Sequence, residues 1–281
     1  GTYSVNIKNF NFLPSAYFLN KWLNFIFLPL MLINYSFYLL LNRNIKIVHI
    51  HGASRGSFYR KYFYFLIGKK VFSKKIIYHI HGAEYHIFFK QANRILKRLV
   101  SNMINYSDGL IVLSSEWSVY FKENFEQKNI YVVNNIVPYN HRISKPEPEI
   151  IKFLFLGKIG NRKGIFDLLN ILSQNVDLFK NDIKLIIGGD GEVNKLKLFI
   201  KENNLNKIVE YVGWVSGEKK NELLNSTDVL ILPSYNEGLP ISLLEAMSYS
   251  MPIISTNVGG IPQVLTDLEN GRMVEPGDFK Q

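Results

Sequence analysis

The 281-residue sequence predicts an α/β protein made of two Rossmann-like βαβ domains. Short runs of β-branched and aromatic residues alternate with longer helical patterns, which is typical of parallel βαβ units. The strand-like runs are almost continuously apolar, as expected for strands that are buried on both faces of a sheet. The length also suits two domains, because an average domain holds roughly 100–200 residues.

The predicted strands fall into two groups. Those of the first half cover residues 45–51, 76–81, 109–113 and 130–133. Helical stretches fill the gaps between them, such as residues 92–106. Those of the second half cover residues 152–156, 183–187, 209–212, 229–232 and 252–255.

A proline-rich stretch separates the two groups of strands. Residues 138–150 combine three prolines with mixed charge and no hydrophobic periodicity, which is typical of a domain linker. We therefore expect one Rossmann-like domain over residues 1–137 and a second over residues 151–281. The chain begins with Gly1 rather than Met and stops where the pattern leads into another helix, so we expect a fragment in which both domains are incomplete.

Composition narrows the possible functions. The absence of cysteine excludes a disulfide scaffold, a thiolate nucleophile and any zinc or iron–sulfur site built on sulfur. The net charge of +10 is uneven, because residues 1–145 carry 19 Lys and Arg against 5 Asp and Glu, whereas residues 146–281 carry 14 against 18. The basic half suits an anionic membrane surface or a polyphosphate. No RNA-binding aromatic signature or helix-turn-helix pattern supports nucleic acid as the partner.

Residues 22–42 contain no charged side chain, and about 20 residues is the length that crosses a bilayer. Polar residues and a proline interrupt this stretch, namely Asn24, Pro29, Asn34, Tyr35 and Ser36. They favour a core helix or a helix at the membrane interface over a spanning one. The aromatic and basic residues that follow, over residues 57–75, are typical either of an interfacial surface or of a solvated basic helix face.

The strongest local signal lies in residues 233–247, where a buried strand ends in a loop and a helix begins. Ligands of open α/β sheets bind outside the carboxyl ends of the strands, which is where the loop places Glu237. Pro240 suits the first helical turn, and the free N–H groups of that turn attract anions. Glu245 follows among apolar neighbours, where its carboxylate needs a partner such as a ribose diol. The alternative is two ordinary surface glutamates.

This pattern, Glu237 and Glu245 separated by seven residues with Gly238 and Pro240 between them, resembles the retaining glycosyltransferases of the GT-B fold, family 4. Residues 209–229 and 252–262 also follow the order usual in that family. The likeness covers most of the second half. It implies two Rossmann-like domains that face a cleft, with the first strand and the last helices of a complete member lying outside this sequence.

The resemblance also implies a donor site for a UDP- or GDP-linked sugar and no other cofactor. Residues 155–164 resemble the family's strand and basic loop, so Lys163 is expected to bind the donor diphosphate. Lys158 stands where an arginine is usual and loses the bidentate fork, for which Arg162 can compensate. Fixed cations stabilise the charge of the leaving diphosphate without a metal, and we expect none. The full expected donor set is Gly157, Lys158, Arg162, Lys163, Gly189, Gly213, Glu237, Gly238, Leu239, Pro240 and Glu245.

Four of the six histidines stand in pairs at the ends of two predicted strands. Alternation places His49 and His51 on one face of their strand, and His79 and His81 likewise. Zinc chelation is conceivable, but we favour a core role for His49 and His79. By the resemblance, His81 contacts the donor and joins Glu237 and Lys163 as a catalytic residue. His51 and Arg55 are candidates for the acceptor side.

The sequence as a whole therefore predicts retaining transfer of a sugar to a lipid-linked or polysaccharide acceptor in bacterial surface-glycan biosynthesis, either lipopolysaccharide or capsule. The expected location is the cytoplasmic face of the cell membrane, with the protein bound peripherally to anionic lipid. An epimerase or phosphorylase of the same fold is one alternative, although a phosphorylase would need a pyridoxal-binding lysine. A noncatalytic membrane-surface module is another alternative.

Overall fold

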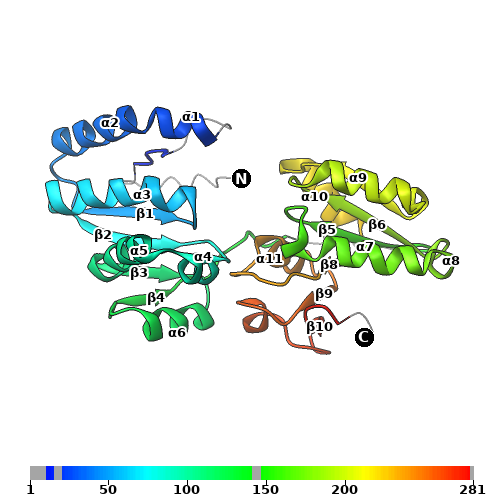
Figure 1. Ribbon diagram of the computed structural model, residues 1–281. Coiled ribbons are helices and arrows are strands. Elements are labelled where there is room, and N and C mark those ends of the chain that lie inside the picture. The colour runs from blue at the N-terminus through cyan, green and yellow to red at the C-terminus, as the bar shows by residue number, and fades with distance from the viewer. Residues whose placement is uncertain (1–10, 16–20, 141–146, 279–281) are drawn as a thin grey trace. The chain divides into compact units, whose positions relative to one another are not determined.

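A computed structural model describes residues 11–15, 21–140 and 147–278. The chain divides into two compact units, Thr2–Asn134 and Asn135–Gln281, which we call the N-terminal and the C-terminal unit (Figure 1). Six residues of the expected linker, 141–146, lie outside the described part of the chain. Residues 135–140, which include the start of the linker, belong to the C-terminal unit, in which Asn135 Nδ2 donates to Leu239 O at 2.7 Å and Asn140 N donates to Ser248 O at 3.3 Å.

The N-terminal unit is built on a parallel sheet in the order β1-β2-β3-β4. Its strands are β1 (Ile47–Gly52), β2 (Lys75–Ile80), β3 (Gly109–Val112) and β4 (Ile130–Val132). The helices between them are α3 (Gly56–Leu66), α4 (Tyr85–Gln91), α5 (Arg94–Tyr106) and α6 (Ser115–Asn124), with a π-helical turn over Ile67–Val71. The four predicted strands are present. The predicted helix over residues 92–106 starts only at Arg94, because the side chain of Asn93 caps it by accepting from Leu96 N.

The uncharged stretch before β1 forms two helices, α1 (Lys21–Ile26) and α2 (Leu28–Leu41). Pro29 lies in the first turn of α2, where a missing N–H costs nothing. One face of α2 is buried in the core through Leu28, Met31, Tyr35 and Leu39. Among the residues described, no helix is both long enough and apolar enough to cross a membrane.

The C-terminal unit contains a parallel sheet in the order β10-β9-β8-β5-β6-β7. Its strands are β5 (Ile151–Leu156), β6 (Ile183–Gly188), β7 (Val209–Gly213), β8 (Val229–Leu232), β9 (Ile253–Thr256) and β10 (Arg272–Val274). Its helices are α7 (Ile165–Gln174), α8 (Val176–Phe179), α9 (Val193–Glu202), α10 (Gly217–Ser226) and α11 (Ile241–Ser248), with 3₁₀ turns at Asn161–Lys163, Leu205–Lys207 and Ile261–Gln263. The sequence had predicted five of these strands but not β10.

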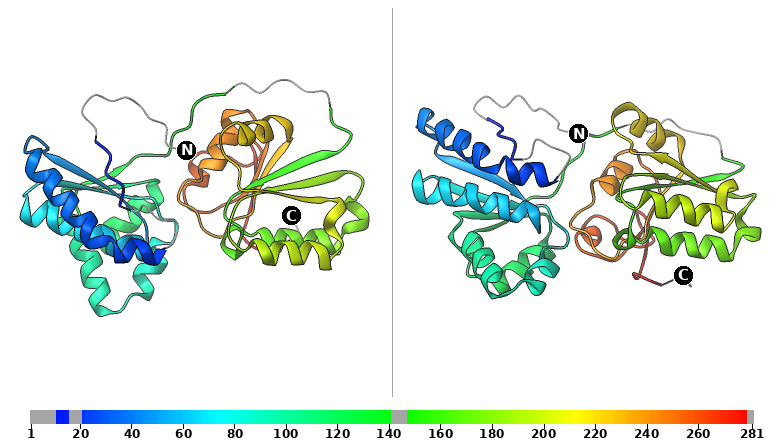
Figure 2. Two further views of the ribbon diagram at one scale, coloured as in Figure 1. Left: turned by 90° about the horizontal axis from the view of Figure 1, so that it is seen from above. Right: turned by 45° about the horizontal axis from the view of Figure 1, so that its top comes forward.

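The strand order reverses at the middle of this sheet. The chain runs outward from β5 through β6 to β7, then returns to place β8 on the other side of β5. Right-handed crossovers therefore put α7 and α9 on one face and α10 and α11 on the other, as the two views of Figure 2 show. A doubly wound sheet with such a reversal opens a crevice at the carboxyl ends of the two strands where the direction changes, here β5 and β8.

Candidate active site

Two loops meet at the carboxyl ends of β5 and β8. Residues 157–164 follow β5, and residues 233–240 follow β8. Tyr235 N donates to Arg162 O at 2.9 Å, and Arg162 Nη1 donates to Asn236 O at 2.6 Å. Gly164 has a φ of 66°, and a Cβ there would lie 1.9 Å from Pro233 O. Only glycine therefore allows the two loops to approach this closely.

The loops bring Lys163 and Glu237 into a buried ion pair. Lys163 Nζ lies 2.6 Å from Glu237 Oε1, and Arg162 Nη1 lies 3.5 Å from the same oxygen. Lys163 is 8% exposed and Glu237 is 5% exposed. Burial lowers the pKa of Lys163, and the neighbouring carboxylate of Glu237 acts in the opposite direction. Two cations thus face one carboxylate, which leaves an excess of positive charge at the crevice.

One oxygen of Glu237, Oε1, is the atom that both cations contact. This oxygen is fully buried, and its contacts with the described residues are ion pairs whose angles differ from those of a regular hydrogen bond. A ligand anion that draws these cations away would leave this buried carboxylate in need of another hydrogen-bond donor. A hydroxyl group would meet this need.

The backbone of Glu237 is held in place by the loop after β9. Gly260 N donates to Gly238 O at 2.6 Å, and Thr256 Oγ1 donates to Ser234 O at 2.5 Å. Gly259 has a φ of 57°, and a Cβ there would lie 1.9 Å from Glu237 O. The sequence had drawn attention to this loop only through the family likeness, because a support that acts through backbone atoms leaves no signature of residue type.

The remaining expected donor residues surround this centre. Gly157 lies under the side chain of Lys163, since a Cβ there would be 3.3 Å from Lys163 Cε. Gly189 N donates to Gly213 O at 2.9 Å, which joins the carboxyl ends of β6 and β7. Leu239 and Pro240 are buried, and Pro240 is the N-cap of α11 rather than part of its first turn. Lys158 is exposed, and it is not among the described cations in contact with Glu237.

Glu245 has a partner that the sequence analysis missed. It lies on α11, is 8% exposed, and forms an ion pair with Lys220 of α10 through Oε1. The expectation that this carboxylate needs a partner is met from within the chain, by a lysine that lies 25 residues earlier. The only signal available was the pair of lysines on α10, which looks like an ordinary solvated helix face.

In the N-terminal unit the expected residues cluster at the carboxyl ends of β1 and β2. His51 Nδ1 lies 2.8 Å from His81 Nε2, and His81 N donates to Gly52 O at 2.9 Å. Arg55 is exposed and has a φ of 57°, a strained conformation for a residue other than glycine. His79 is buried, as expected, whereas His49 is exposed, so the core role expected for His49 is wrong. Alternation had fixed the face of the strand but not whether that face is covered.

Comparison with known proteins places this site in a family. A sequence model of the family "Glycosyl transferases group 1" matches residues 138–281, which is just over half of the chain. The chain belongs to this family. The matched residues include every element of the Lys163 and Glu237 centre.

Several named proteins are similar to this chain in sequence. A 41.2 kDa protein in the cps region of Klebsiella pneumoniae is 27% identical over 85% of this chain and 69% of its own length. The amylovoran biosynthesis glycosyltransferase AmsD of Erwinia amylovora is 29% identical over 60% of this chain and 49% of its own length. The lipopolysaccharide 1,6-galactosyltransferase of Escherichia coli is 33% identical over 47% of this chain and 38% of its own length. This chain thus spans about half or less of the last two relatives.

Solved structures give the fold. TarM matches with a TM-score of 0.71 and 22% identity over 88% of this chain and 49% of its own. HepE of Anabaena, in complex with UDP, matches with a TM-score of 0.67 and 15% identity over 88% of this chain and 68% of its own. These matches confirm the predicted α/β fold with parallel sheets, which is that of the GT-B glycosyltransferases.

Proposed function

We propose that this chain transfers a sugar from a UDP- or GDP-linked donor to a lipid-linked or polysaccharide acceptor in surface-glycan biosynthesis. The observation that carries the proposal is the buried pair of Lys163 and Glu237, with Arg162 beside it, at the reversal of the strand order. It offers cations for a diphosphate and, once these cations contact the phosphate, a carboxylate for a sugar hydroxyl beside them. The names of the Erwinia and Escherichia relatives support the surface-glycan assignment, and the HepE complex supports a UDP-linked donor.

In this proposal the cations serve the leaving group. The acceptor hydroxyl forms a bond to the anomeric carbon while the bond from that carbon to the diphosphate oxygen breaks, and the hydroxyl proton passes to the phosphate. The diphosphate gains negative charge in this step, which Lys163, Arg162 and the N-terminal N–H groups of α7 stabilise. The charge is met without a metal ion. Because Lys163 already pairs with Glu237, the donor phosphate competes for its ammonium and frees the carboxylate for the sugar.

The carboxylates serve the rest of the donor. Glu237 accepts from the sugar hydroxyls and thereby holds the anomeric carbon near the phosphate cations. Glu245 accepts hydrogen bonds from the ribose hydroxyls. Before the donor binds, Lys220 offsets the charge of this carboxylate. Retention of configuration and the role of His81 rest on the family likeness given above, and His51 and Arg55 are the candidates for the acceptor side.

The experiment that tests this function follows nucleotide release. The chain is incubated with UDP- and GDP-sugars and a lipid-linked acceptor extract, and free UDP or GDP is measured. We expect release that requires the acceptor and is lost in Lys163→Ala. The matched control is Lys184→Ala, which removes a lysine from an exposed ion pair with Glu210 on the sheet. Interconversion of sugar nucleotides without release would favour an epimerase, and no reaction at all would favour a noncatalytic module.

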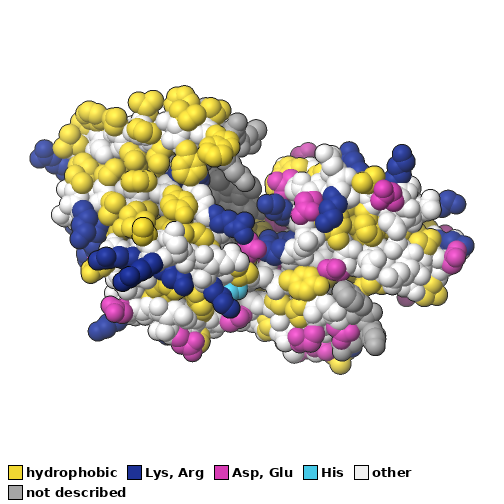
Figure 3. Space-filling model, in the orientation of Figure 1, with side chains coloured by type: hydrophobic (Ala, Val, Ile, Leu, Met, Phe, Trp, Pro, Cys, Tyr) yellow, Lys and Arg dark blue, Asp and Glu magenta, His cyan; other side chains and the backbone are white. Residues whose placement is uncertain are grey.

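We further propose that the N-terminal unit binds the surface of an anionic membrane. The outer face of α1 and α2 is apolar and exposed, whereas the inner face of α2 is buried in the core. Figure 3 shows hydrophobic side chains gathered over these two helices. The most exposed are Trp22, Ile26, Leu30, Ile33, Phe37 and Leu41. Helices that are apolar on both faces need a second apolar environment, and a bilayer interface supplies one beside the basic side chains of this unit.

Membrane binding is tested with vesicles. Leu30, which is 62% exposed on α2, and Leu178, which is 66% exposed on α8, form a matched pair for substitution by Glu. Burying a leucine is worth about 1.5–3 kcal/mol, so Leu30→Glu should weaken sedimentation with anionic vesicles by roughly tenfold or more. Leu178→Glu should not. Equal behaviour of the two variants, or equal binding to zwitterionic vesicles, would contradict the proposed surface.

A further inference from the structure

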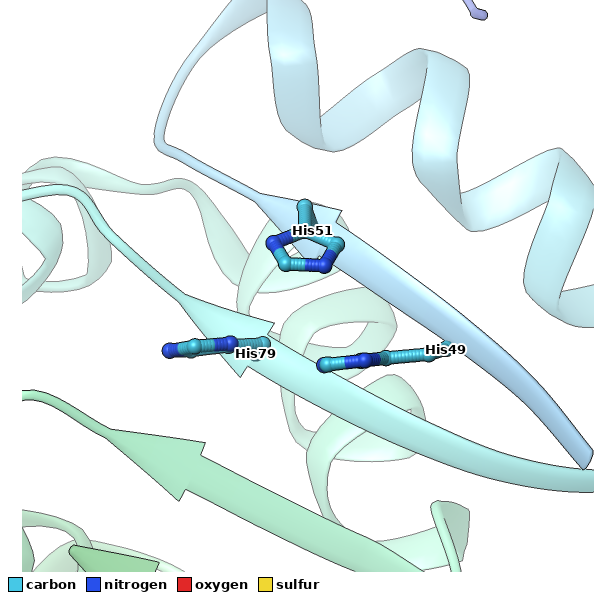
Figure 4. A group of neighbouring side chains, drawn as sticks. All are labelled: His49, His51 and His79. Carbon is cyan, nitrogen blue, oxygen red and sulfur yellow. The ribbon is translucent and has the colours of Figure 1, made fainter. Parts of the chain in front are cut away.

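Four imidazole rings share one face of the N-terminal sheet. Parallel pairing sets His51 of β1 opposite His79 of β2, and His49 lies two residues earlier on the same face. The ring centroids of His49 and His79 lie 5.4 Å apart, those of His51 and His79 lie 5.1 Å apart, and those of His49 and His51 lie 4.3 Å apart. Figure 4 shows these three rings gathered over the two neighbouring strands.

We propose that His49, His51 and His79 bind a divalent transition-metal ion, for which Zn²⁺ is the best fit. One ring nitrogen from each residue lies within 4.8 Å of the others. Zn–N bonds of about 2.0–2.1 Å put tetrahedral ligands about 3.3 Å apart, so small rotations of the rings would close the triad. Imidazole ligands without a carboxylate or thiolate select zinc, copper or nickel over magnesium and calcium.

The burial of His79 is the second observation that points to a ligand. This residue is 8% exposed, and both of its ring nitrogens are buried without a hydrogen-bond partner among the described residues. An imidazole always has at least one nitrogen that needs a partner, and a buried one without it is unfavourable. A metal ion between the three rings would supply a partner to His79.

The fourth histidine completes the arrangement as a positioning residue. His51 Nδ1 lies 2.8 Å from His81 Nε2, and the proton between them can sit on either ring. When His51 donates from Nδ1, the lone pair on its Nε2 is left for the metal, and His81 fixes the tautomer and the ring orientation. Metal-binding histidines nearly always have such an outer partner.

The protonation states agree with this role. Partial burial of the rings, followed by the neighbouring histidines, lowers the pKa of His49 to about 4 and that of His79 to about 3. Partial burial also lowers the pKa of His51. The three rings are therefore neutral at pH 7, which is the form that binds metal.

This proposal departs from the sequence-based expectation that the protein binds no metal. All four histidines belong to the N-terminal unit, so the inference does not depend on the donor site of the C-terminal unit. A three-histidine set leaves a fourth position open to water or to an anionic oxygen. The ion would therefore supply a Lewis-acidic contact next to His51 and Arg55, the residues expected on the acceptor side.

The test uses the chain without an oligohistidine tag, after treatment with a chelator that is then removed. Zn²⁺ affinity is measured by competition with a chromogenic chelator, and Co²⁺ is added in parallel to record the visible absorption of a site with nitrogen ligands. We expect one Zn²⁺ per chain. His49→Ala and His79→Ala should each lower the affinity by more than about 100-fold, because even outer partners are worth about 10–100-fold.

The control is His86→Ala on α4, whose ring packs against Trp117 with centroids 5.3 Å apart. It should retain full Zn²⁺ affinity. If His79→Ala fails to fold, the exposed His49 still decides the question, since its substitution leaves the core intact. No Zn²⁺ binding by the unmodified chain, or equal affinity in a folded His49→Ala variant, would overturn the proposal.

Discussion

Replacing Lys163 by methionine should destabilise the C-terminal unit by an amount that the structure allows us to work out. Methionine keeps the length of the apolar stem but removes the ammonium that lies 2.6 Å from Glu237 Oε1. Glu237 is then left as a carboxylate that is only 5% exposed. Breaking a buried pair in this way costs about 3–5 kcal/mol.

Arg162 sets the value within that range. At an effective dielectric constant of about 20, the gross attraction to Glu237 is about 6 kcal/mol for a cation at 2.6 Å and about 5 kcal/mol for one at 3.5 Å. The guanidinium of Arg162 at 3.5 Å therefore retains much of the stabilisation after Lys163 is lost. We expect a loss near the lower limit, about 3 kcal/mol.

The double variant Lys163→Met with Glu237→Gln removes both charges and should recover about 2 kcal/mol of that loss, because no uncompensated carboxylate remains. The assay is native-state hydrogen exchange, read by mass spectrometry on peptides from β5 and β8, which separates this unit from the other. Lys184→Met breaks an exposed pair and should cost less than about 1 kcal/mol. A cost below about 1 kcal/mol for Lys163→Met, or a double variant less stable than the single one, would refute this account of the centre.

Two further predictions concern the loop contact and pH. Gly164→Ala should lower stability and donor affinity clearly more than Gly217→Ala. Both glycines have a positive φ, but only at Gly164 would a Cβ meet another backbone segment, 1.9 Å from Pro233 O. Equal losses of stability in urea unfolding would argue against a tight loop contact. Burial lowers the pKa of His79 to about 3 and that of His81 to about 4, below the ordinary value of 6.5, so the unfolded chain binds more protons between pH 6.5 and about 4. The metal-free N-terminal unit should therefore lose stability as the pH falls through that window, and the His79→Gln variant should lose less stability over the same window. A midpoint of urea unfolding that does not change between pH 7 and pH 4.5 would contradict this.

The sequence predicted the strands well because each is a short apolar run bounded by polar or turn residues. β10 was not predicted, because its three residues, one of which is arginine, are too few to show a periodic hydrophobic pattern. Pro29 and the polar residues in this stretch argued against one long spanning helix, and the structure divides the stretch into α1 and α2. The exposure of the outer face of α2 was not readable, since an apolar residue looks the same in a core and on a surface.

The family likeness grouped the candidate residues into one donor site, but the sequence did not predict the contacts between them. Lys163 and Glu237 were each placed after a strand, and only the strand order, with β8 returning to the side of β5, makes them neighbours. The pairing of Glu245 with Lys220 joins two helices and has no local signal. The histidine cluster needed the register of β1 and β2, which alternation within each strand does not determine.

The central claim is that the crevice at β5 and β8 binds a nucleoside diphosphate, and calorimetric titration of UDP and GDP into the chain tests it most directly. We expect one of the two nucleotides to bind with a stoichiometry of one, and its binding to be lost in Lys163→Ala and Glu245→Ala but kept in Lys184→Ala. Binding of neither nucleotide, or binding that survives in Lys163→Ala, would contradict the claim.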